Sequence, residues 1–261
     1  MDNTLLYSIE SFPPLRESIT KINALCSGKN IDVKAFTRII ESDPVLYIDI
    51  LHFSNAPRHG FRHPITSISQ AISLFGIPAI RGMAITAALK AHPFTDLSAY
   101  GITMEEWFKV MEIQQQFLEL WLGKKHPVIL QQLGGLTFVL EIGRLVAAYV
   151  LMFTNNNARF TTHEPLSLLL EEKKVIGNSG DELAAKLFQL WYFDDTFVDA
   201  LRYSMNPAYG LEPQTCAALM CTRFLFALDG IKPFEDIEPL LERFDLQSAD
   251  VRKAYTTLVK K

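Results

Sequence analysis

Cysteine is scarce in this sequence, with Cys26, Cys216 and Cys221 the only three in 261 residues. Three is too few, and an odd number, for a disulfide framework, so we expect small buried side chains in a reducing cytoplasm. An excess of basic residues is also absent, since 25 Lys and Arg face 29 Asp and Glu. The resulting net charge of −4 argues against nucleic acids and anionic membranes as partners, because both require a basic field.

The motifs that usually bind nucleotides or activate a nucleophile are missing as well. The chain contains no Gly-x-Gly-x-x-Gly, no Gly-Lys-Ser/Thr, no Gly-x-Ser-x-Gly and no His-Glu-x-x-His. These absences remove the dinucleotide-binding, P-loop, α/β-hydrolase and zincin classes from consideration.

The longest apolar run, from Leu133 to Phe153, has about the length that a membrane-spanning helix needs. Glu141 and Arg144 lie in its middle, where each would cost on the order of 3 kcal/mol at the centre of a bilayer. Their i, i+3 spacing would let them pair on one face of a helix. We therefore predict no membrane span and a buried core helix over this run. The apolar segment as a whole opens at Pro127 and runs to about Phe153.

Apolar residues make up 49% of the chain, 18 Phe among them, which excludes intrinsic disorder. Helical periodicity recurs almost everywhere and strand alternation almost nowhere. Asp43 and Pro44 are typical of a helix start, Thr103 begins a capping box, and Gly76 ends a helix before Pro78 opens the next. Short helices with tight connections predict an all-α fold, a multi-helix orthogonal bundle. Later helices are expected over residues 164–175, 181–193, 195–204, 213–229, 236–244 and 247–260.

Basic residues concentrate in one loop between two predicted helices, at Arg58, His59, Arg62 and His63. His59 and His63 could ligate a transition metal, but the flanking arginines would repel a cation. The loop could also bind a small anion or a partner. The third alternative is a solvated connection without a ligand.

Several ordered motifs resemble the HDOD family. The chain reads Pro-Pro-Leu at 13–15, then IIESDPVL at 39–46, LHFSNA at 51–56, ITSISQAISLFG at 65–76 and GLTFVLEIGRL at 135–145. Glu172 to Gly177, Glu182-Leu183 and Trp191 resemble later family segments. The resemblance covers residues 10–210 and implies an HD-like fold, with an N-terminal helical subdomain at 10–100 and a helical core at 101–210. Residues 211–261 are expected to add helices that pack on the same domain.

HDOD domains resemble the HD phosphohydrolases, whose metal site uses a first His, a His-Asp pair and a later Asp. The His-Asp pair falls here on Leu140 and Glu141, and the first His falls near Lys109 or Val110. Leucine cannot ligate, and one glutamate cannot hold a divalent ion alone. The resemblance therefore implies a protein without catalytic metal or cofactor, in which Glu141 and Arg144 pair where the ancestral site stood. The family motifs give Asp43, Pro44, Asn55, Gly76 and Gly143 structural roles, with Asp43 as a helix N-cap and Asn55 capping a helix end.

The resemblance implies a non-catalytic bacterial signalling protein that acts through contacts with signalling proteins, and that a ligand could switch. One alternative is a metal-dependent phosphohydrolase or phosphodiesterase with a relocated site among Glu112, Glu119, Glu141 and Asp181. Another alternative is a sensor that binds a small nucleotide in the degenerate cavity.

Overall fold

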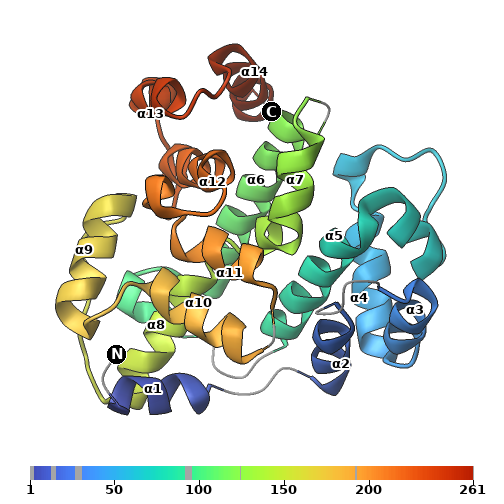
Figure 1. Cartoon of the computed structure of the whole chain (residues 1–261), viewed down its shortest axis with the longest axis horizontal. Coiled ribbons are helices and arrows are strands. Elements are labelled where there is room, and N and C mark those ends of the chain that lie inside the picture. The colour runs from blue at the N-terminus through green and yellow to red at the C-terminus, as the bar shows by residue number, and fades with distance from the viewer. Residues whose placement is uncertain are drawn as a thin grey trace.

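The computed structural model describes residues 3–12, 16–26, 31–91, 96–123, 125–191 and 193–260. Within these residues the chain is almost wholly helical, and its strands are one short pair (Figure 1). The all-α prediction is therefore confirmed. Figure 1 shows the helices between residues 17 and 90, in blue to teal, gathered at the right of the view, and the last helices, in red, at its top.

Four helices form an N-terminal group in which each helix packs against the next. Asp43 starts the third of them as predicted, because its side chain accepts a hydrogen bond from the backbone N–H of Leu46 at 3.1 Å and Pro44 is the first helical residue. Asp32 caps the second helix in the same way. The four helices are α2 (Glu17–Cys26), α3 (Val33–Glu41), α4 (Pro44–Ser54) and α5 (Ile68–Lys90), and the short 3-10 helix η1 (Pro57–His59) follows α4.

Helix α5 bends sharply at Gly76, where the sequence predicts a helix end. Gly76 has φ 77° and ψ 160°, a conformation that residues with a β-carbon avoid. Beyond Pro78, residues 80–89 are all buried. Helix α5 is long and apolar enough to cross a membrane. This is weak evidence for a membrane span, because 56% of its apolar window is buried inside the protein. The absence of a membrane span stays a prediction.

In the apolar segment that opens at Pro127, Leu133 and residues 135–151 are buried, but the prediction of one continuous helix from Leu133 to Phe153 is wrong. A β-carbon on Gly82 of α5 would lie 2.7 Å from the Cα of Gly135, so the two backbones pack directly on each other at this point. Val139 then leaves helical conformation at φ −135° and ψ 26°. The segment divides into α7 (Pro127–Leu133), the 3-10 helix η3 (Gly134–Phe138) and α8 (Ile142–Phe153).

A second group of helices is centred on α8, which is buried along nearly its whole length. It packs against α9, α10 and the 3-10 helix η2, and α10 packs in turn against α11. Helix α1, which the sequence did not predict, packs on α8 and α10 and buries Leu5 and Ile9. The bounds are α1 (Asn3–Glu10), η2 (Ser98–Tyr100), α9 (Pro165–Ile176), α10 (Gly180–Leu190) and α11 (Asp195–Arg202).

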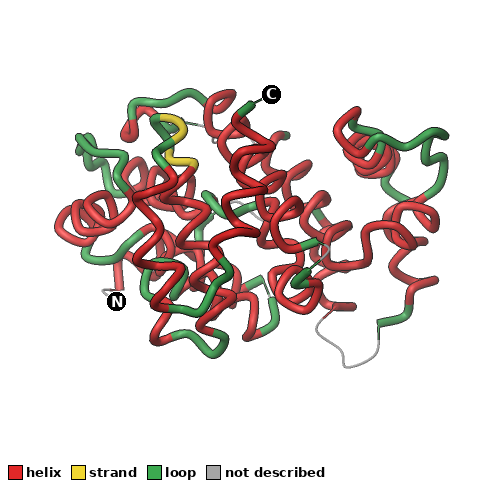
Figure 2. Tube along the Cα trace, turned by 90° about the horizontal axis from the view of Figure 1, so that it is seen from above, coloured by secondary structure: helices red, strands yellow, loops and turns green. Residues whose placement is uncertain are grey.

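Helix α6 (Met104–Leu122) begins at the predicted capping box of Thr103 and Glu106 and packs against η3, α12 and α14. Helix α12 ends at Leu225, earlier than predicted, because the chain turns back in a two-strand hairpin that the sequence analysis missed (Figure 2). Gly230, at φ 121°, lets the hairpin close. The C-terminal elements are the 3-10 helix η4 (Pro207–Tyr209), α12 (Pro213–Leu225), β1 (Phe226–Ala227), β2 (Gly230–Ile231), η5 (Phe234–Ile237), α13 (Glu238–Arg243) and α14 (Ser248–Val259).

The cysteines are free thiols. Cys216 and Cys221 are buried in α12 as predicted, and burial raises the pKa of each to about 12, so both stay protonated. Cys26 is only half-buried, at the end of α2. The division of the chain at residues 100 and 210 stays a prediction.

Candidate functional site

Five charged side chains meet in the interior around the predicted degenerate position at Leu140 and Glu141. Each is at most 4% exposed, and we call these five residues the charge cluster. Side chains of these types are almost never buried so completely unless they are paired. The members are Glu141 just before α8, Arg144 in the first turn of α8, Glu172 of α9, Asp181 of α10 and Arg223 of α12.

Arg223 joins two of the three carboxylates. Its Nη2 donates a hydrogen bond to Oδ1 of Asp181 at 2.9 Å, its Nη1 donates to the other oxygen of Asp181, and its Nε lies 3.2 Å from Oε1 of Glu141. The guanidinium also donates to the carbonyl of Leu140 and, at 3.0 Å, to the hydroxyl of Ser204. A planar group with several donors suits such a position better than a point charge would. The predicted site residue Leu140 thus contributes its backbone oxygen.

Arg144 joins the third carboxylate to Glu141. Its Nη1 lies 2.7 Å from Oε1 of Glu172, and its Nε lies 3.4 Å from Oε2 of Glu141, so the i, i+3 pair suggested by the sequence is present. Glu172 also accepts hydrogen bonds from the hydroxyl of Tyr100 and from the backbone N–H of Gly180, each at 2.7 Å. Both oxygens of Glu172 are therefore in use.

Helix α6 holds Glu141 from the opposite side. The side-chain amide of Gln114 donates to Oε1 of Glu141 at 2.9 Å and to the carbonyl of Phe226 at 2.8 Å. The indole N–H of Trp107 donates to the backbone carbonyl of Glu141 at 3.0 Å. The cluster thus connects α6, α8, α9, α10 and α12, which are distant in sequence.

Close backbone packing between α8 and α10 positions the cluster. A β-carbon on Gly180 would lie 2.5 Å from the carbonyl oxygen of Gly143, and one on Gly143 would lie 2.7 Å from Oδ1 of Asp181. Only glycine leaves room for this crossing. Gly143, singled out by the family motif, therefore has a steric role beside the charges.

Pairing keeps the cluster ionised despite its burial. Burial alone would raise the pKa of Asp181, but the guanidinium groups of Arg223 and Arg144 outweigh it and hold that pKa below the usual value for an aspartate. Burial would lower the pKa of both arginines, and the carboxylates around them raise it above the ordinary value instead. Burial, and then Glu172, raise the pKa of Tyr100, whose phenol stays protonated and donates.

The metal ion of the HD phosphohydrolases does not fit these residues. The cluster contains no imidazole, and two guanidinium groups already contact its carboxylates, so that a further cation would meet like charge. Elsewhere in the described residues, too, no three His, Cys, Asp or Glu side chains are placed to hold a metal ion. The absence of a catalytic metal remains a prediction for which this geometry supplies a reason.

Of the four acids considered for a relocated hydrolase site, the structure brings together Glu141 and Asp181, through Arg223. Glu112 and Glu119 lie further along α6, where their partners are Gln116 and Gln115. Glu141 and Asp181 thus meet arginines, and Glu112 and Glu119 each accept a hydrogen bond from a side-chain amide.

The described side chains of the basic loop lie in different surroundings. The ring of His59 is half-buried and packs against Phe61 and Phe75, with ring centroids 5.9 Å and 4.9 Å away. Arg62 and His63 are exposed, and the side chain of Arg58 lies outside the described residues. Binding of an anion or partner by this loop stays a prediction.

Asn55 lies at the C-terminus of α4, where the sequence places a cap. Its side-chain N–H donates to the carbonyls of Leu51 at 2.9 Å and Ile65 at 2.8 Å, and its oxygen accepts from the backbone N–H of Ile65 at 2.7 Å. Asn55 thus also fastens the start of α5 to the end of α4, which the motif alone did not indicate.

A further buried arginine, Arg81 of α5, links the N-terminal group to α11. Its Nε donates to Asn23 of α2 at 2.9 Å, and its Nη1 lies 3.3 Å from Asp194, the N-cap of α11. The guanidinium also lies over the ring of Phe193, 3.7 Å from the centroid. Arg81 therefore holds the two groups of helices together.

Sequence reasoning missed Arg223, Arg81, Gln114 and Tyr100. A usable signal existed for Arg223, because it is the lone charge in the apolar run from Cys216 to Leu225. A charge in such a run indicates a buried partner. Its partners could not be identified, since they lie on other helices.

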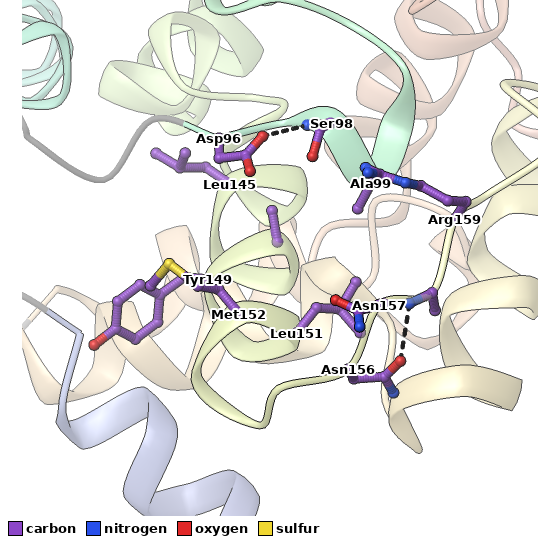
Figure 3. A pocket seen from close by; sticks show the side chains of 12 residues that line it. Asp96, Ser98, Ala99, Leu145, Tyr149, Leu151, Met152, Asn156, Asn157 and Arg159 are labelled. Carbon is purple, nitrogen blue, oxygen red and sulfur yellow. Dashed lines mark hydrogen bonds between the residues drawn. The ribbon is translucent and has the colours of Figure 1, made fainter.

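Among the described residues, the surface hollows include four that Glu141 does not line. Figure 3 shows the residues that line one of about 280 Å³ beside α8, Arg159 among them, where Asp96 accepts a hydrogen bond from the backbone N–H of Ser98 at 2.8 Å. Tyr149 turns its hydroxyl away from this hollow and donates to the carbonyl of Ser11.

Comparison with known proteins assigns this arrangement to a family. Residues 12–207 match the model of a family described as HDOD domain. None of the curated proteins compared with the chain matches it significantly.

Solved structures share the fold at low identity. A provisionally assigned signal transduction protein from Marinobacter aquaeolei aligns with a TM-score of 0.70 at 20% identity, over 99% of this chain and 62% of its own. A provisionally assigned phosphohydrolase from Shewanella amazonensis aligns with a TM-score of 0.66 at 19% identity, over 99% and 94%. An HDOD domain protein of unknown function from Geobacter sulfurreducens aligns with a TM-score of 0.56 at 16% identity, over 97% and 88%. These similarities show the fold alone.

Proposed function

The chain belongs to the HDOD family, and from that premise we propose that it is a non-catalytic bacterial signalling protein of the cytoplasm that works by binding other proteins. One observation carries the proposal: Arg144 and Arg223 lie among Glu141, Glu172 and Asp181, where an HD phosphohydrolase would hold its metal ion. The two arginines thus supply the positive charge that a metal ion would otherwise bring.

The exchange of a metal ion for arginines removes the chemistry and keeps the packing. A bound divalent ion would acidify water and polarise a phosphate, which a guanidinium of raised pKa cannot do. The guanidinium of Arg223 still ties α12 to Asp181 of α10, and that of Arg144 ties α8 to Glu172 of α9. The helices therefore keep one arrangement. Removing either arginine would leave a buried carboxylate uncompensated.

Binding to other proteins is supported by the family and by exposed apolar side chains. Leu166 and Leu170, one turn apart on α9, are 40% and 65% exposed, and Val45 and Ile48 on α4 are 51% and 64% exposed. Single exposed apolar residues are ordinary, but pairs on one helix face are the places to test for a contact.

Site-specific photo-crosslinking in the source cell tests the proposal. A photoreactive residue at position 170 or position 48 is expected to capture the same protein repeatedly. Leu166→Glu is expected to abolish the capture from position 170, and Val45→Glu the capture from position 48. The matched control is a photoreactive residue at the exposed Thr257 of α14. Capture that is equal at all three positions, or no capture at all, would contradict binding through these faces.

A further inference from the structure

A hollow of about 440 Å³ lies between the N-terminal group and α6, apart from the charge cluster. Side chains of α4 and α5 form one wall, and side chains of α6 form the other. This volume is in the range of cavities that hold small ligands, which often lie between two parts of a fold.

Lys90 stands at the rim of the hollow between two aromatic rings. Its Nζ lies 4.8 Å from the ring centroid of Phe53 on α4 and 5.0 Å from that of Phe108 on α6. Both rings hold the ammonium group by cation–π attraction. No carboxylate of the described residues forms an ion pair with Lys90, whereas Lys109 on the same rim is paired with Glu105 at 2.7 Å. Lys90 is thus a positioned cation whose charge is not neutralised.

The floor of the hollow is mostly apolar, and the one buried amide among its described lining residues, Gln115, already donates to Glu119. Met111 and Phe138 are 3% and 6% exposed. The buried hydroxyl of Thr86 already donates to the carbonyl oxygens of Gly82 and Phe138. The interior therefore offers apolar surface, and the rim offers one cation.

We propose that this hollow binds a small aromatic monocarboxylate, with its ring between Phe53, Phe108 and Phe138 and its carboxylate at Lys90. A ligand with several negative charges, such as a nucleotide, is disfavoured because Glu105 and Glu112 share the rim. The proposal goes beyond the protein-binding function. It is independent of the charge cluster, whose residues do not line the hollow.

Binding here would also affect the fold, because the ligand touches both walls. A molecule that binds only when α4, α5 and α6 are in place stabilises that arrangement by mass action. The hollow is therefore where a small anion could switch the protein.

Calorimetric titration with naphthalene-2-carboxylate and its neutral analogue naphthalene-2-carboxamide tests the proposal on the full chain. The carboxylate is expected to saturate one site and to bind about tenfold more tightly than the amide, because it alone pairs with Lys90. Lys90→Met is expected to abolish that difference and to leave the amide unchanged. Phe108→Ala is expected to weaken both probes, since it removes part of the apolar wall.

Lys109→Met is the matched control, because Lys109 lies on the same rim but is already paired with Glu105. It is expected to preserve the preference for the carboxylate. Equal loss in both lysine variants, equal affinity for both probes, or no saturation by either probe at millimolar concentration would overturn the proposal. Circular dichroism of each variant confirms folding. The metal content and the phosphodiesterase activity of the protein do not depend on this hollow. A failure of the ligand proposal can therefore be told apart from a failure of the proposed function.

Discussion

Arg223 and Asp181, which lie 42 residues apart in the sequence, are in contact in the interior, with Nη2 of the arginine 2.9 Å from Oδ1 of the aspartate. Each side chain is 1% exposed. Neither charge could remain there alone, because the desolvation of an unpaired ion costs several kcal/mol. The contact joins α12 to α10 beside Glu141.

Arg223→Met tests the structural role of this pair. The substitution keeps most of the side-chain volume but leaves Asp181 and part of Glu141 uncompensated. We expect the free energy of unfolding, measured with urea, to fall by about 3–5 kcal/mol. The double variant Arg223→Met, Asp181→Asn should recover part of that loss, because the unpaired charge is gone.

Arg252→Met is the control for Arg223→Met. Arg252 pairs with Glu235 and Glu238, but it is about half exposed. Exposed ion pairs contribute little to stability, so we expect Arg252→Met to lower the free energy of unfolding by less than about 1 kcal/mol. A similar loss in both arginine variants would contradict a special role for the buried pair.

The lowered pKa of Asp181 predicts a specific pH dependence. Because its folded-state pKa lies below the unfolded value of 3.8, Asp181 stabilises the fold above that pH, and the contribution disappears as the pH falls through the folded-state pKa. Wild type should exceed Asp181→Asn in unfolding free energy at pH 7, and the difference should shrink below about pH 4. Urea unfolding of both proteins at a series of pH values measures this difference. A difference that does not change with pH would refute the prediction.

Gly180→Ala tests the crossing of α8 and α10. The added β-carbon would lie 2.5 Å from the carbonyl oxygen of Gly143, and backbone cannot move aside as a side-chain tip can. We expect thermal or urea unfolding to show a loss of about 3 kcal/mol.

Gly177→Ala is the control for the crossing, because its β-carbon would meet open space and only its φ of +87° opposes the change. We expect Gly177→Ala to lower the free energy of unfolding by about 1 kcal/mol. An equal or smaller effect at Gly180 would show that the helices can separate.

Asn55→Asp tests the link between α4 and α5. The aspartate keeps the acceptor for the N–H of Ile65 but sets a negative charge against the carbonyls of Leu51 and Ile65. We expect a loss of about 1–3 kcal/mol and faster hydrogen exchange at the Ile65 amide. Unchanged exchange would mean that Asn55 does not hold this junction.

The helices that could be predicted are those whose signals are local. Asp43, Thr103 and Gly76 act on backbone groups within a few residues, so the sequence alone indicates what they do. The pairing of Glu141 with Arg144 could be predicted for the same reason, since i, i+3 spacing fixes it on one helix. The HD-like arrangement came from the family resemblance.

The elements that could not be predicted depend on contacts far along the chain. The adjacent Gly134 and Gly135 are a local sign of a break before α8, but the approach of Gly135 to Gly82 could not be predicted, because Gly82 lies on another helix. Arg223 reaches the carbonyl of Leu140 across 83 residues, so its place in the site needed the fold. The helix periodicity in Pro213–Asp229 gave no sign of the hairpin at Phe226, which depends on two short strands pairing.

The metal content of the purified protein tests the central claim most directly. Protein produced with iron, manganese, zinc and magnesium supplied, then dialysed, is assayed by mass spectrometry for bound metal and with bis(4-nitrophenyl) phosphate for hydrolysis. We predict far less than one ion per chain and no hydrolysis above the blank, because Arg144 and Arg223 already occupy the carboxylates. Close to one bound metal ion per chain, with both the metal and the phosphodiesterase activity lost in Glu141→Gln, would contradict the claim.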